Sequence, residues 1–335
     1  MKKVTIKDIA KVAKVSYATV SRALSGSPEI SEDTRERVVK ICKEMGYTPN
    51  SVARSMVMKQ TKLLGLIVTS VENPFMSEIA YHIERNARAH GYNIMLCNSS
   101  HDINLEEQVF ELLMGRQVDG IIIVPSSVDT YGRLKKHLSK VPTVFVSENL
   151  RDLPESYVAV DNYRGMYIGT EYLYSLGHRD ILYFGRRKRS STHQLRAEGY
   201  SDACIQFGLT PHFFNSPYSS SSIQHGYTLA KQLFATKPPH TAIFAATDSL
   251  ALGVLQAADE AGIRIPEEMS LLGFDNIHYT GLPKINLSTI EQPKMTMASI
   301  AVEMLVEKIR NPSIGYSHQI LIPTLIKRKS CIALQ

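Results

Sequence analysis

Polar side chains follow nearly every apolar run between residues 62 and 276. The runs are typical of buried strands, and the hydroxyls, amides and carboxylates after them lie at 70–75, 98–100, 125–127, 147–148, 185–192, 248 and 275–276. Open parallel sheets bind ligands outside the carboxyl ends of their strands, so we expect these groups to line one cleft. Carboxylates, guanidinium groups and hydroxyls bond adjacent hydroxyls of a ligand, which predicts a small hydroxylated molecule such as a sugar.

Motifs that carry catalysis or bind nucleotides are absent from the sequence. There is no GxGxxG after a strand, no GxxxxGK[ST], no GxSxG and no HExxH. The cysteines are scattered without a CxxC pair, at Cys42, Cys97, Cys204 and Cys331, which is typical of reduced residues and not of a zinc site. We therefore expect neither an enzyme nor a bound cofactor or metal.

The stretch VSYATVSRALSG at 15–26 carries a second set of chemically useful residues. At about 100° per residue Val20, Ala23 and Leu24 point inward, while small side chains and Arg22 point outward. Such a face lets a helix approach the major groove closely, and an arginine there can bond guanine. Residues 1–60 also hold 12 Lys+Arg and 6 Asp+Glu, which is the whole net charge of +6, so this segment is expected to bind phosphates.

Three short helices are expected to position that face. The first begins at Thr5, with Asp8 at the capping-box position, the second begins after Ser16, and the third spans 31–46. Only two residues lie between the first two helices, which predicts a helix-turn-helix. The basic segment NSVARSMVMKQ at 50–60 is too short for a stable isolated helix and is expected to order only against a partner.

The rest of the chain alternates between apolar strands and amphipathic helices. The first series has strands at 63–69, 92–97, 119–124 and 143–147, with helices near 76–90, 104–116 and 130–139. The second has strands at 180–185, 241–248 and 270–276, with helices near 163–176, 192–207, 223–236 and 249–261. This pattern predicts an all-α helix-turn-helix head and an α/β core of two doubly wound parallel-sheet subdomains.

The chain resembles the lactose-repressor/galactose-repressor (LacI/GalR) family of bacterial transcription regulators over essentially its whole length. The resemblance rests on seven motifs in the family order: TIKDIAKVAKVSYATVSRALSG, YTPNSVARSM, GLIVTSVENPFMSEI, VDGIIIVPSS, SLGHRDILYFG, FAATDSLALGVLQAADEAGIRIPEEMSLLGFDN and LSTIEQPKMTMASIAVEML. It implies a core like that of a periplasmic sugar-binding protein (periplasmic binding protein-like I), with three crossovers of the chain between its subdomains. An effector in the cleft would change the angle between the subdomains and so the hinge.

The resemblance also implies boundaries for the parts. The DNA-binding domain is expected at 1–48, the hinge helix at 49–61, the N-terminal effector subdomain at 62–160 plus 292–321, and the C-terminal one at 161–291 plus 322–335. Family members bind near-palindromic operators as dimers. Since no leucine-heptad helix follows the last strand, we expect a homodimer and not the tetramer that some relatives form.

Two groups of residues are predicted to contact double-stranded DNA. In the head, bases are assigned to Tyr17, Ala18 and Arg22, and phosphates to Ser16, Thr19 and Ser21, with Thr5 added at the start of the first helix. In the hinge, the resemblance assigns Asn50, Ser51, Ala53 and Arg54 to the minor groove, with Met56 as the apolar wedge where the family usually has leucine. Lys14 also departs from the family, which often has glycine at that turn.

The resemblance assigns effector contacts to residues from both subdomains. They are Asn73, Phe75, Ser126, Glu148, Ser190, Thr192, Arg196, Asp248 and Asp275. Alternatives remain for three of them, because an aspartate after a strand can merely cap a helix, as for Asp248, and Arg196 and Asp275 can form a structural ion pair. Glu148 departs from the aspartate that many relatives carry. The basic run RRKR at 186–189 is either a solvated loop or an attraction for an anionic effector such as a uronate or a sugar phosphate.

The sequence therefore predicts a repressor of a carbohydrate-utilisation operon that is controlled by a small sugar-like, possibly anionic, effector. The alternative is a corepressor-dependent regulator that senses a purine or a phosphorylated metabolite, and an activator or an α/β enzyme is the weaker interpretation. No apolar run approaches the roughly 18 residues of a membrane helix, and charged residues follow the initial MKK, so we expect a cytoplasmic protein with no signal peptide and no membrane partner.

Overall fold

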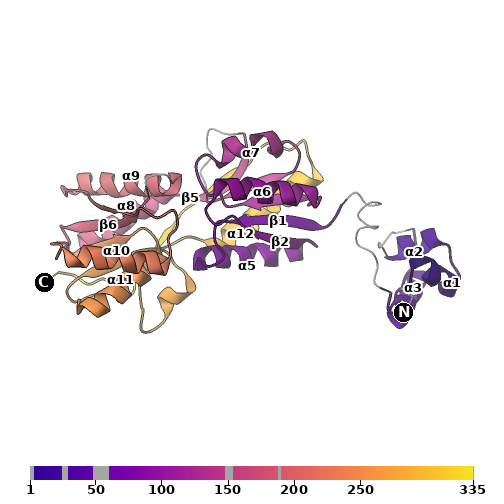
Figure 1. Ribbon diagram of the computed structural model, residues 1–335, viewed down its shortest axis with the longest axis horizontal. Coiled ribbons are helices and arrows are strands. Elements are labelled where there is room, and N and C mark those ends of the chain that lie inside the picture. Colours follow the sequence, from indigo (N-terminus) through magenta and orange to yellow (C-terminus); the bar gives the residue numbers. More distant parts are fainter. Residues whose placement is uncertain (1–3, 25–28, 48–59, 148–153, 188–189, 335) are drawn as a thin grey trace. The chain divides into compact units, whose positions relative to one another are not determined.

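The structure is a computed structural model that describes residues 4–24, 29–47, 60–147, 154–187 and 190–334. The chain divides into two units, an N-terminal head at 1–62 and a core at 63–335. Figure 1 shows the helices and strands of both units, which are described here one at a time.

The head consists of α1 (Ile6–Ala13), α2 (Tyr17–Leu24) and α3 (Glu32–Glu44). Thr5 and Asp8 form the predicted capping box at the start of α1, and Ser16 Oγ accepts a hydrogen bond from the Thr19 amide at 3.0 Å at the start of α2. Lys14 ends α1 with φ 55° and ψ 40°, a left-handed conformation that turns the chain sharply into α2. The predicted helix-turn-helix is confirmed.

A small apolar core holds the three helices of the head together. Its buried members all lie on the inward faces of the helices: Ile9, Ala10, Ala13, Val20, Ala23, Val38 and Cys42. A domain of this size buries a smaller share of its surface than a large domain does, so each of these contacts matters for its stability.

The first sheet of the core has the strand order β11-β5-β4-β3-β1-β2, and all its pairs are parallel. The strands are β1 (Leu63–Val68), β2 (Asn93–Asn98), β3 (Gly120–Ile123), β4 (Thr143–Val146), β5 (Ser156–Val160) and β11 (His318–Leu321). Four helices flank it: α5 (Pro74–Ala89), α6 (Ile103–Gly115), α7 (Thr130–Leu138) and α12 (Lys294–Arg310). In Figure 1, α5 and α12 cover one face and α6 and α7 the other, each pair over its own apolar cluster.

The second sheet has the order β12-β10-β9-β8-β6-β7, and only the β10/β12 pair is antiparallel. The strands are β6 (Ile181–Arg186), β7 (His212–Asn215), β8 (Ala242–Ala245), β9 (Ser270–Asp275), β10 (Ser288–Glu291) and β12 (Thr324–Ile326). The helices are α8 (Asn162–Ser175), α9 (Ser191–Gln206), α10 (Ile223–Ala235) and α11 (Asp248–Ala261), with the short 3₁₀ helix η1 (His278–Gly281) after β9. Helix α8 packs against α9, and α10 against α11.

The three helices predicted for the head and the strands and helices predicted for the core are present, whereas the hinge helix expected at 49–61 falls almost entirely outside the described residues. The structure also adds elements that the pattern did not indicate. These are the strands β5, β7, β10, β11 and β12 and the helix α12. The chain passes from the first sheet to the second after β5, returns after β10, and crosses again between β11 and β12. Two doubly wound sheets, joined by three connections of the chain, confirm the predicted fold class.

Candidate ligand cleft and nucleic-acid interface

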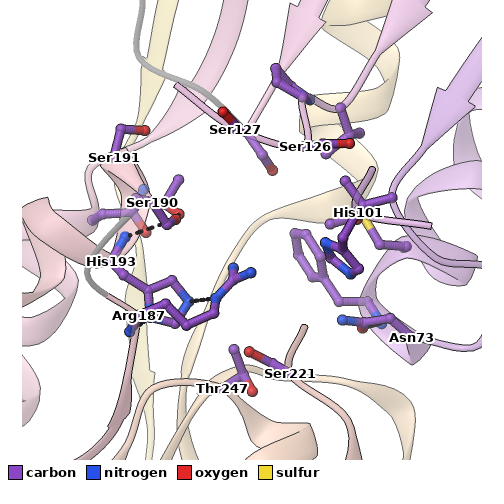
Figure 2. Close-up of a pocket in the computed structure, with 18 of the residues that line it drawn as sticks. Asn73, His101, Ser126, Ser127, Arg187, Ser190, Ser191, His193, Ser221 and Thr247 are labelled. Carbon is purple, nitrogen blue, oxygen red and sulfur yellow. Dashed lines mark hydrogen bonds between the residues drawn. The ribbon is translucent and has the colours of Figure 1, made fainter. Parts of the chain in front are cut away.

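A cavity of about 90 Å³ lies where the carboxyl ends of the strands of both sheets meet. Asn73, His101, Ser126 and Ser127 come from the first sheet and its helices, and residues of the second sheet face them (Figure 2). At roughly 10–15 Å³ for each water position, this space holds on the order of six to nine waters. A single small sugar is therefore of the right size for this conformation.

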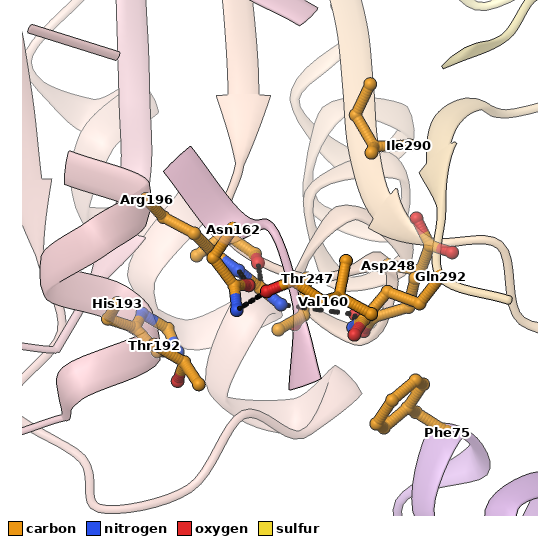
Figure 3. A network of polar contacts seen from close by, with 12 residues as sticks. Phe75, Val160, Asn162, Thr192, His193, Arg196, Thr247, Asp248, Ile290 and Gln292 are labelled. Carbon is orange, nitrogen blue, oxygen red and sulfur yellow. Dashed lines mark hydrogen bonds and ion pairs between the residues drawn. The ribbon is translucent and has the colours of Figure 1, made fainter. Parts of the chain in front are cut away.

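Arg196 projects from α9 and is 5% exposed. Its Nε donates to Asn162 Oδ1 at 2.8 Å and its Nη1 to the Ala246 carbonyl at 2.5 Å. Its guanidinium carbon lies 3.7 Å from the ring centre of Phe274, and its Nη2 lies 3.7 Å from Asp275 Oδ1. Figure 3 shows Arg196 beside Asn162 in this network of polar contacts. Arg196 therefore lies in the structural ion pair that the sequence offered as an alternative, and it also lines the cavity.

Asp275 ends β9 with an unusual backbone, at φ 124°. Gln292 Nε2 donates to its carboxylate at 2.6 Å. Burial raises the pKa of Asp275 to about 6, and the positive charge of Arg196 opposes that rise. Asp275 is 3% exposed and lines the cavity.

Asp248 is not brought to the cavity wall. It is completely buried, with Thr289 Oγ1 donating to its Oδ1 at 2.6 Å and the Ile277 amide donating to its Oδ2 at 2.9 Å. Burial and the nearby charge of Asp275 raise its pKa to about 7. The residue that caps α11 and lines the cavity is Thr247, one position earlier, so the expectation that Asp248 itself faces the ligand is corrected.

Asn73, Phe75 and Ser126 lie on the first-sheet side as predicted. Asn73 Oδ1 caps α5 by accepting from the Phe75 amide at 3.0 Å, and Phe75 is 4% exposed beside the cavity. Ser126 Oγ donates to Glu106 Oε2 at 2.6 Å, and its amide donates to the same oxygen at 2.7 Å. Burial raises the pKa of Glu106, while its hydrogen bonds from Ser126 and Thr130 oppose the rise. Sequence reasoning missed this supporting glutamate, because it lies on α6 and not after a strand.

Ser190 and Thr192 lie at the start of α9, where their hydroxyl groups share a hydrogen bond of 2.8 Å. Both line the cavity, and Ser190 also caps the helix. Glu148 lies outside the described residues. The pattern overlooked His101, His193, Ser221, Thr247 and Gln292, which all line the cavity. His101 follows the polar stretch 98–100 by one residue, so a slightly longer reading of that strand end finds it.

A polar contact joins the two halves of the core near the cavity. Glu78 of α5 accepts from the His278 amide at 2.7 Å and lies 3.3 Å from Lys294 Nζ. Lys294 is 8% exposed and donates to the carbonyls of Asp275 at 2.9 Å and Asn276 at 2.7 Å. The backbone that carries Asp275 is thereby connected to a helix of the first sheet.

One cluster in the described part of the chain has the composition of a metal site. Glu107, Glu111 and His137 place one ligand atom each within 4.8 Å of one another. Lys136 Nζ lies 2.8 Å from Glu107 Oε1, and Arg133 also approaches this carboxylate. Because lysine and arginine already balance the charge of Glu107, the cluster is an ion-pair network between α6 and α7.

The outward face of α2 carries the residues predicted to contact DNA. Tyr17 is 56% exposed, Ala18 and Arg22 are exposed, and Val20 and Ala23 are buried as expected. Ser16, Thr19 and Ser21 flank this face, with 2.8 Å between Ser16 Oγ and Thr19 Oγ1. Arg22 Nε lies 3.5 Å from Glu29 Oε2, both on the surface. Thr5 is exposed at the start of α1. The hinge residues Asn50, Ser51, Ala53, Arg54 and Met56 lie outside the described residues.

Comparison with known proteins finds relatives that match this chain over nearly its whole length. The model of the lacI family of bacterial regulatory proteins matches residues 5–50, and that of a periplasmic binding protein-like domain matches residues 170–331. The sequence is 32% identical to the ribose operon repressor of Haemophilus influenzae, over 99% of each protein. The chain belongs to the lacI family of bacterial regulatory proteins. This lacI-family protein is also 31% identical to the transcriptional repressor PurR of Pasteurella multocida, over 97% of the chain and 98% of that protein.

Solved structures of the lacI family share this fold. The lac repressor dimer bound to operator and the anti-inducer ONPF matches with a TM-score of 0.86 at 26% identity, covering 99% of this chain and all of that one. A LacI-family regulator from Enterococcus faecium with bound ribose matches with a TM-score of 0.74 at 28% identity, covering 82% of this chain and all of that one. In the described parts of this lacI-family protein, no helix is long and apolar enough to span a membrane.

Proposed function

We propose that this lacI-family protein is a transcription repressor whose operator affinity is controlled by a small, sugar-like ligand in the cleft. The observation that carries the proposal is a set of buried polar atoms, all on residues that line the cavity, that have no hydrogen-bond partner in the described structure: Thr69 Oγ1, His101 Nε2, Ser147 Oγ, Ser191 Oγ and Ser221 Oγ. Buried polar atoms nearly always have partners. A ligand rich in hydroxyl groups supplies them.

Ligand contacts are assigned to both walls of the cavity. Asn73, Phe75 and Ser126 act from the first sheet, and Ser190, Thr192, Arg196 and Asp275 from the second. The Phe75 ring covers an apolar face of the ligand, while Arg196 and Asp275 bond its hydroxyls. A ligand held by both walls stabilises one angle between the halves of the core. The hydrogen bonds that join the halves, from the His278 amide to Glu78 and from Lys294 to the Asp275 carbonyl, adjust with that angle. Asp248 has a structural role, because its buried carboxylate accepts hydrogen bonds from the Ile277 amide and from Thr289 Oγ1.

The regulatory arrangement assigns DNA binding to the head. Tyr17, Ala18 and Arg22 contact bases, Thr5, Ser16, Thr19 and Ser21 contact phosphates, and the hinge adds minor-groove contacts around Met56. We assign the boundaries 1–48, 49–61, 62–160 plus 292–321, and 161–291 plus 322–335. The strand membership of the two sheets supports the division within the core. Regulation and not catalysis is inferred as the activity, and the cytoplasm as its location.

A homodimer is the inferred binding unit. An apolar hollow on α5 and β2 is lined by Leu66, Met76, Ala80 and Ile94 and by the exposed side chains of Val71, Tyr81 and Leu96. Exposed apolar surface of this kind marks protein contacts. Tyr81→Asp is expected to convert the dimer to a monomer in sedimentation analysis, whereas Tyr316→Asp, at a tyrosine of similar exposure outside this hollow, leaves the dimer intact. An unchanged dimer in Tyr81→Asp argues against this surface.

The second candidate function is a repressor that binds its operator only with a purine as corepressor. It is favoured by the similarity to PurR repressors, which reaches 33% identity in Pectobacterium atrosepticum. The two candidates differ in the sign of the ligand effect, because an inducer weakens operator binding and a corepressor strengthens it. Hypoxanthine and guanine therefore belong in the same operator-binding titrations as the sugars.

Selection of binding sites from random DNA tests the DNA-binding part of the proposal. The expected result is a near-palindromic motif, because a two-fold dimer reads two equal half-sites. Arg22→Ala is expected to lower affinity for that motif by about 1–3 kcal/mol and to relax one base position in each half-site. Arg37→Ala removes the same charge from an exposed position of α3 and leaves the base preference unchanged. Recovery of no motif contradicts the proposal.

A further inference from the structure

We propose that the ligand of the cleft carries an acidic group, a carboxylate or a phosphate, which Arg187 binds. The inference rests on the proposed ligand cleft and names the chemical class of its ligand. The regulator from Enterococcus faecium was solved with ribose, which is neutral. An acidic ligand would therefore set this chain apart from that relative.

Arg187 is held in a fixed direction at the cavity wall. Its Nε donates to His193 Nε2 at 3.1 Å, and its Nη1 donates to the Ser219 carbonyl. In Figure 2 the guanidinium points from the second-sheet side into the cavity, toward the side that carries His101. A guanidinium that is already ordered loses little side-chain entropy when it binds an anion. The guanidinium is therefore positioned for a charge-assisted contact with a carboxylate or phosphate.

Three charged side chains belong to the described lining of this cavity. They are Arg187, Arg196 and Asp275, two guanidinium groups and one carboxylate. Asp275 lies beside Arg196, at 3.7 Å. Glu72 and Asp129 line the two adjoining cavities and not this one. An acidic ligand places its negative charge beside guanidinium groups, whose hydrogen bonds to anions are strong because they are charge-assisted.

Further donors surround the same space. Ser191 Oγ and Ser221 Oγ lie next to the first turns of α9 and α10, whose N-termini favour negative charge. Across the cavity, His101 Nε2 is buried without a hydrogen-bond partner in the described structure. Burial and the charge of Arg187 lower the pKa of His101 to about 4, so this imidazole is neutral and offers one N–H donor. An acidic group between Arg187 and His101 meets donors from both halves of the core.

Arg186 provides a matched control. It is the neighbouring residue and has the same side chain, but its guanidinium carbon lies over the ring of Phe213, at 4.6 Å from the ring centre, and it does not line the cavity. A general attraction of anions to the basic run involves both arginines. Recognition in the cleft involves Arg187 alone.

Calorimetric titration of the full-length protein, without DNA, tests the inference. The probes are matched pairs: glucose with glucuronate and with glucose 6-phosphate, and ribose with ribose 5-phosphate, with inorganic phosphate and hypoxanthine as further arms. We expect at least one acidic sugar to bind roughly 10- to 100-fold more tightly than its neutral partner, since a hydrogen bond to a charged group is worth that much. The uronate and phosphate arms identify which acid it is. The preference should decrease as salt increases.

Variants then locate the contact. Arg187→Met is expected to abolish the acid preference, Arg187→Lys to restore part of it, and Arg186→Met to leave it unchanged. Circular dichroism confirms that each variant is folded. A neutral sugar or hypoxanthine that binds more tightly than every acid, a preference that survives Arg187→Met, or no binding by any acidic sugar overturns the inference.

The outcomes separate this inference from the proposed function. If a neutral sugar or a purine binds the cleft and alters operator affinity, the proposed function stands and the acidic ligand is rejected. If an acidic sugar binds through Arg187 but operator affinity does not change at saturation, the acidic ligand stands and the control of DNA binding is rejected.

Discussion

Replacement of Arg196 by methionine probes the buried charge cluster beneath the cleft. Methionine is similar in length but removes the donors to Asn162 and Ala246 and the positive charge near Asp275. Removing one partner of a buried ion pair destabilises a protein by about 3–5 kcal/mol, because the other charge is left in a poor solvent. We expect a loss of this size at pH 8.

The loss should depend on pH through Asp275. Its pKa is about 6 in the fold against 3.8 in the unfolded chain, so native stability falls as pH rises through this window. Arg196 opposes that rise, so Arg196→Met raises the pKa further and extends the window upward. At pH 5 the carboxyl is protonated in both proteins, and the destabilisation is smaller than at pH 8. The difference is about 1.4 kcal/mol for each unit by which the variant raises the pKa.

Urea unfolding followed by far-ultraviolet circular dichroism measures this, because the chain has no tryptophan for fluorescence. Protein concentration is kept constant, since dimerisation contributes to stability. Arg133→Met is the control: this arginine lies 3.5 Å from Glu107 on the surface, and its loss should cost under about 1 kcal/mol at either pH. A penalty for Arg196→Met below about 1 kcal/mol, or one equal at both pH values, refutes the reasoning.

Three further predictions concern the backbone and a second buried acid. Lys14→Gly should stabilise the head by about 0.5–1 kcal/mol, seen as greater hydrogen-exchange protection in α1 and α2, because glycine adopts φ 55° without strain; lower protection would oppose this. Gly226→Ala should destabilise by about 1–3 kcal/mol in urea unfolding, because the added Cβ lies 2.4 Å from the Leu250 carbonyl oxygen, while Gly115→Ala meets nothing within 4 Å and should not destabilise. Asp248→Asn should flatten the fall in stability between pH 4 and 7, since the pKa of Asp248 is raised from 3.8 to about 7 and the wild-type fold loses that contribution as pH rises; an unchanged slope in the variant speaks against the assignment.

Much of the fold is predictable because its periodic signals are strong. The capping box of Thr5 and Asp8 and the continuous apolar strands indicate their elements directly. Strand β10 (Ser288–Glu291) was missed because three of its four residues are polar, yet Ser288 and Thr289 are fully buried. Their hydroxyl groups are satisfied by tertiary partners, since Thr289 Oγ1 donates to Asp248. Composition alone does not reveal such partners, which come from distant parts of the chain.

The site is predictable at the level of strand ends but not at the level of single contacts. Thr247, and not Asp248, reaches the cavity, because Thr247 is the N-cap and Asp248 is already the first residue of α11, with its carboxylate fully buried. His101 enters the cavity wall from a left-handed conformation at φ 58°, which the sequence does not indicate. Arg196 of α9 and Asp275 at the end of β9 are 79 positions apart in the numbering and meet only through the tertiary fold. These outcomes depend on tertiary geometry.

Operator affinity with and without a bound ligand is the most direct test of the central claim that the cleft controls DNA binding. Fluorescence anisotropy is measured on the operator recovered by selection, first for the protein alone and then at saturation with the best ligand from calorimetry. We expect a change of at least about tenfold in the wild type, in line with a coupling free energy of about 1–3 kcal/mol. Arg196→Met, under conditions where it is folded, should bind the same DNA without responding to the ligand. Equal affinity with and without saturating ligand in the wild-type protein would contradict the account.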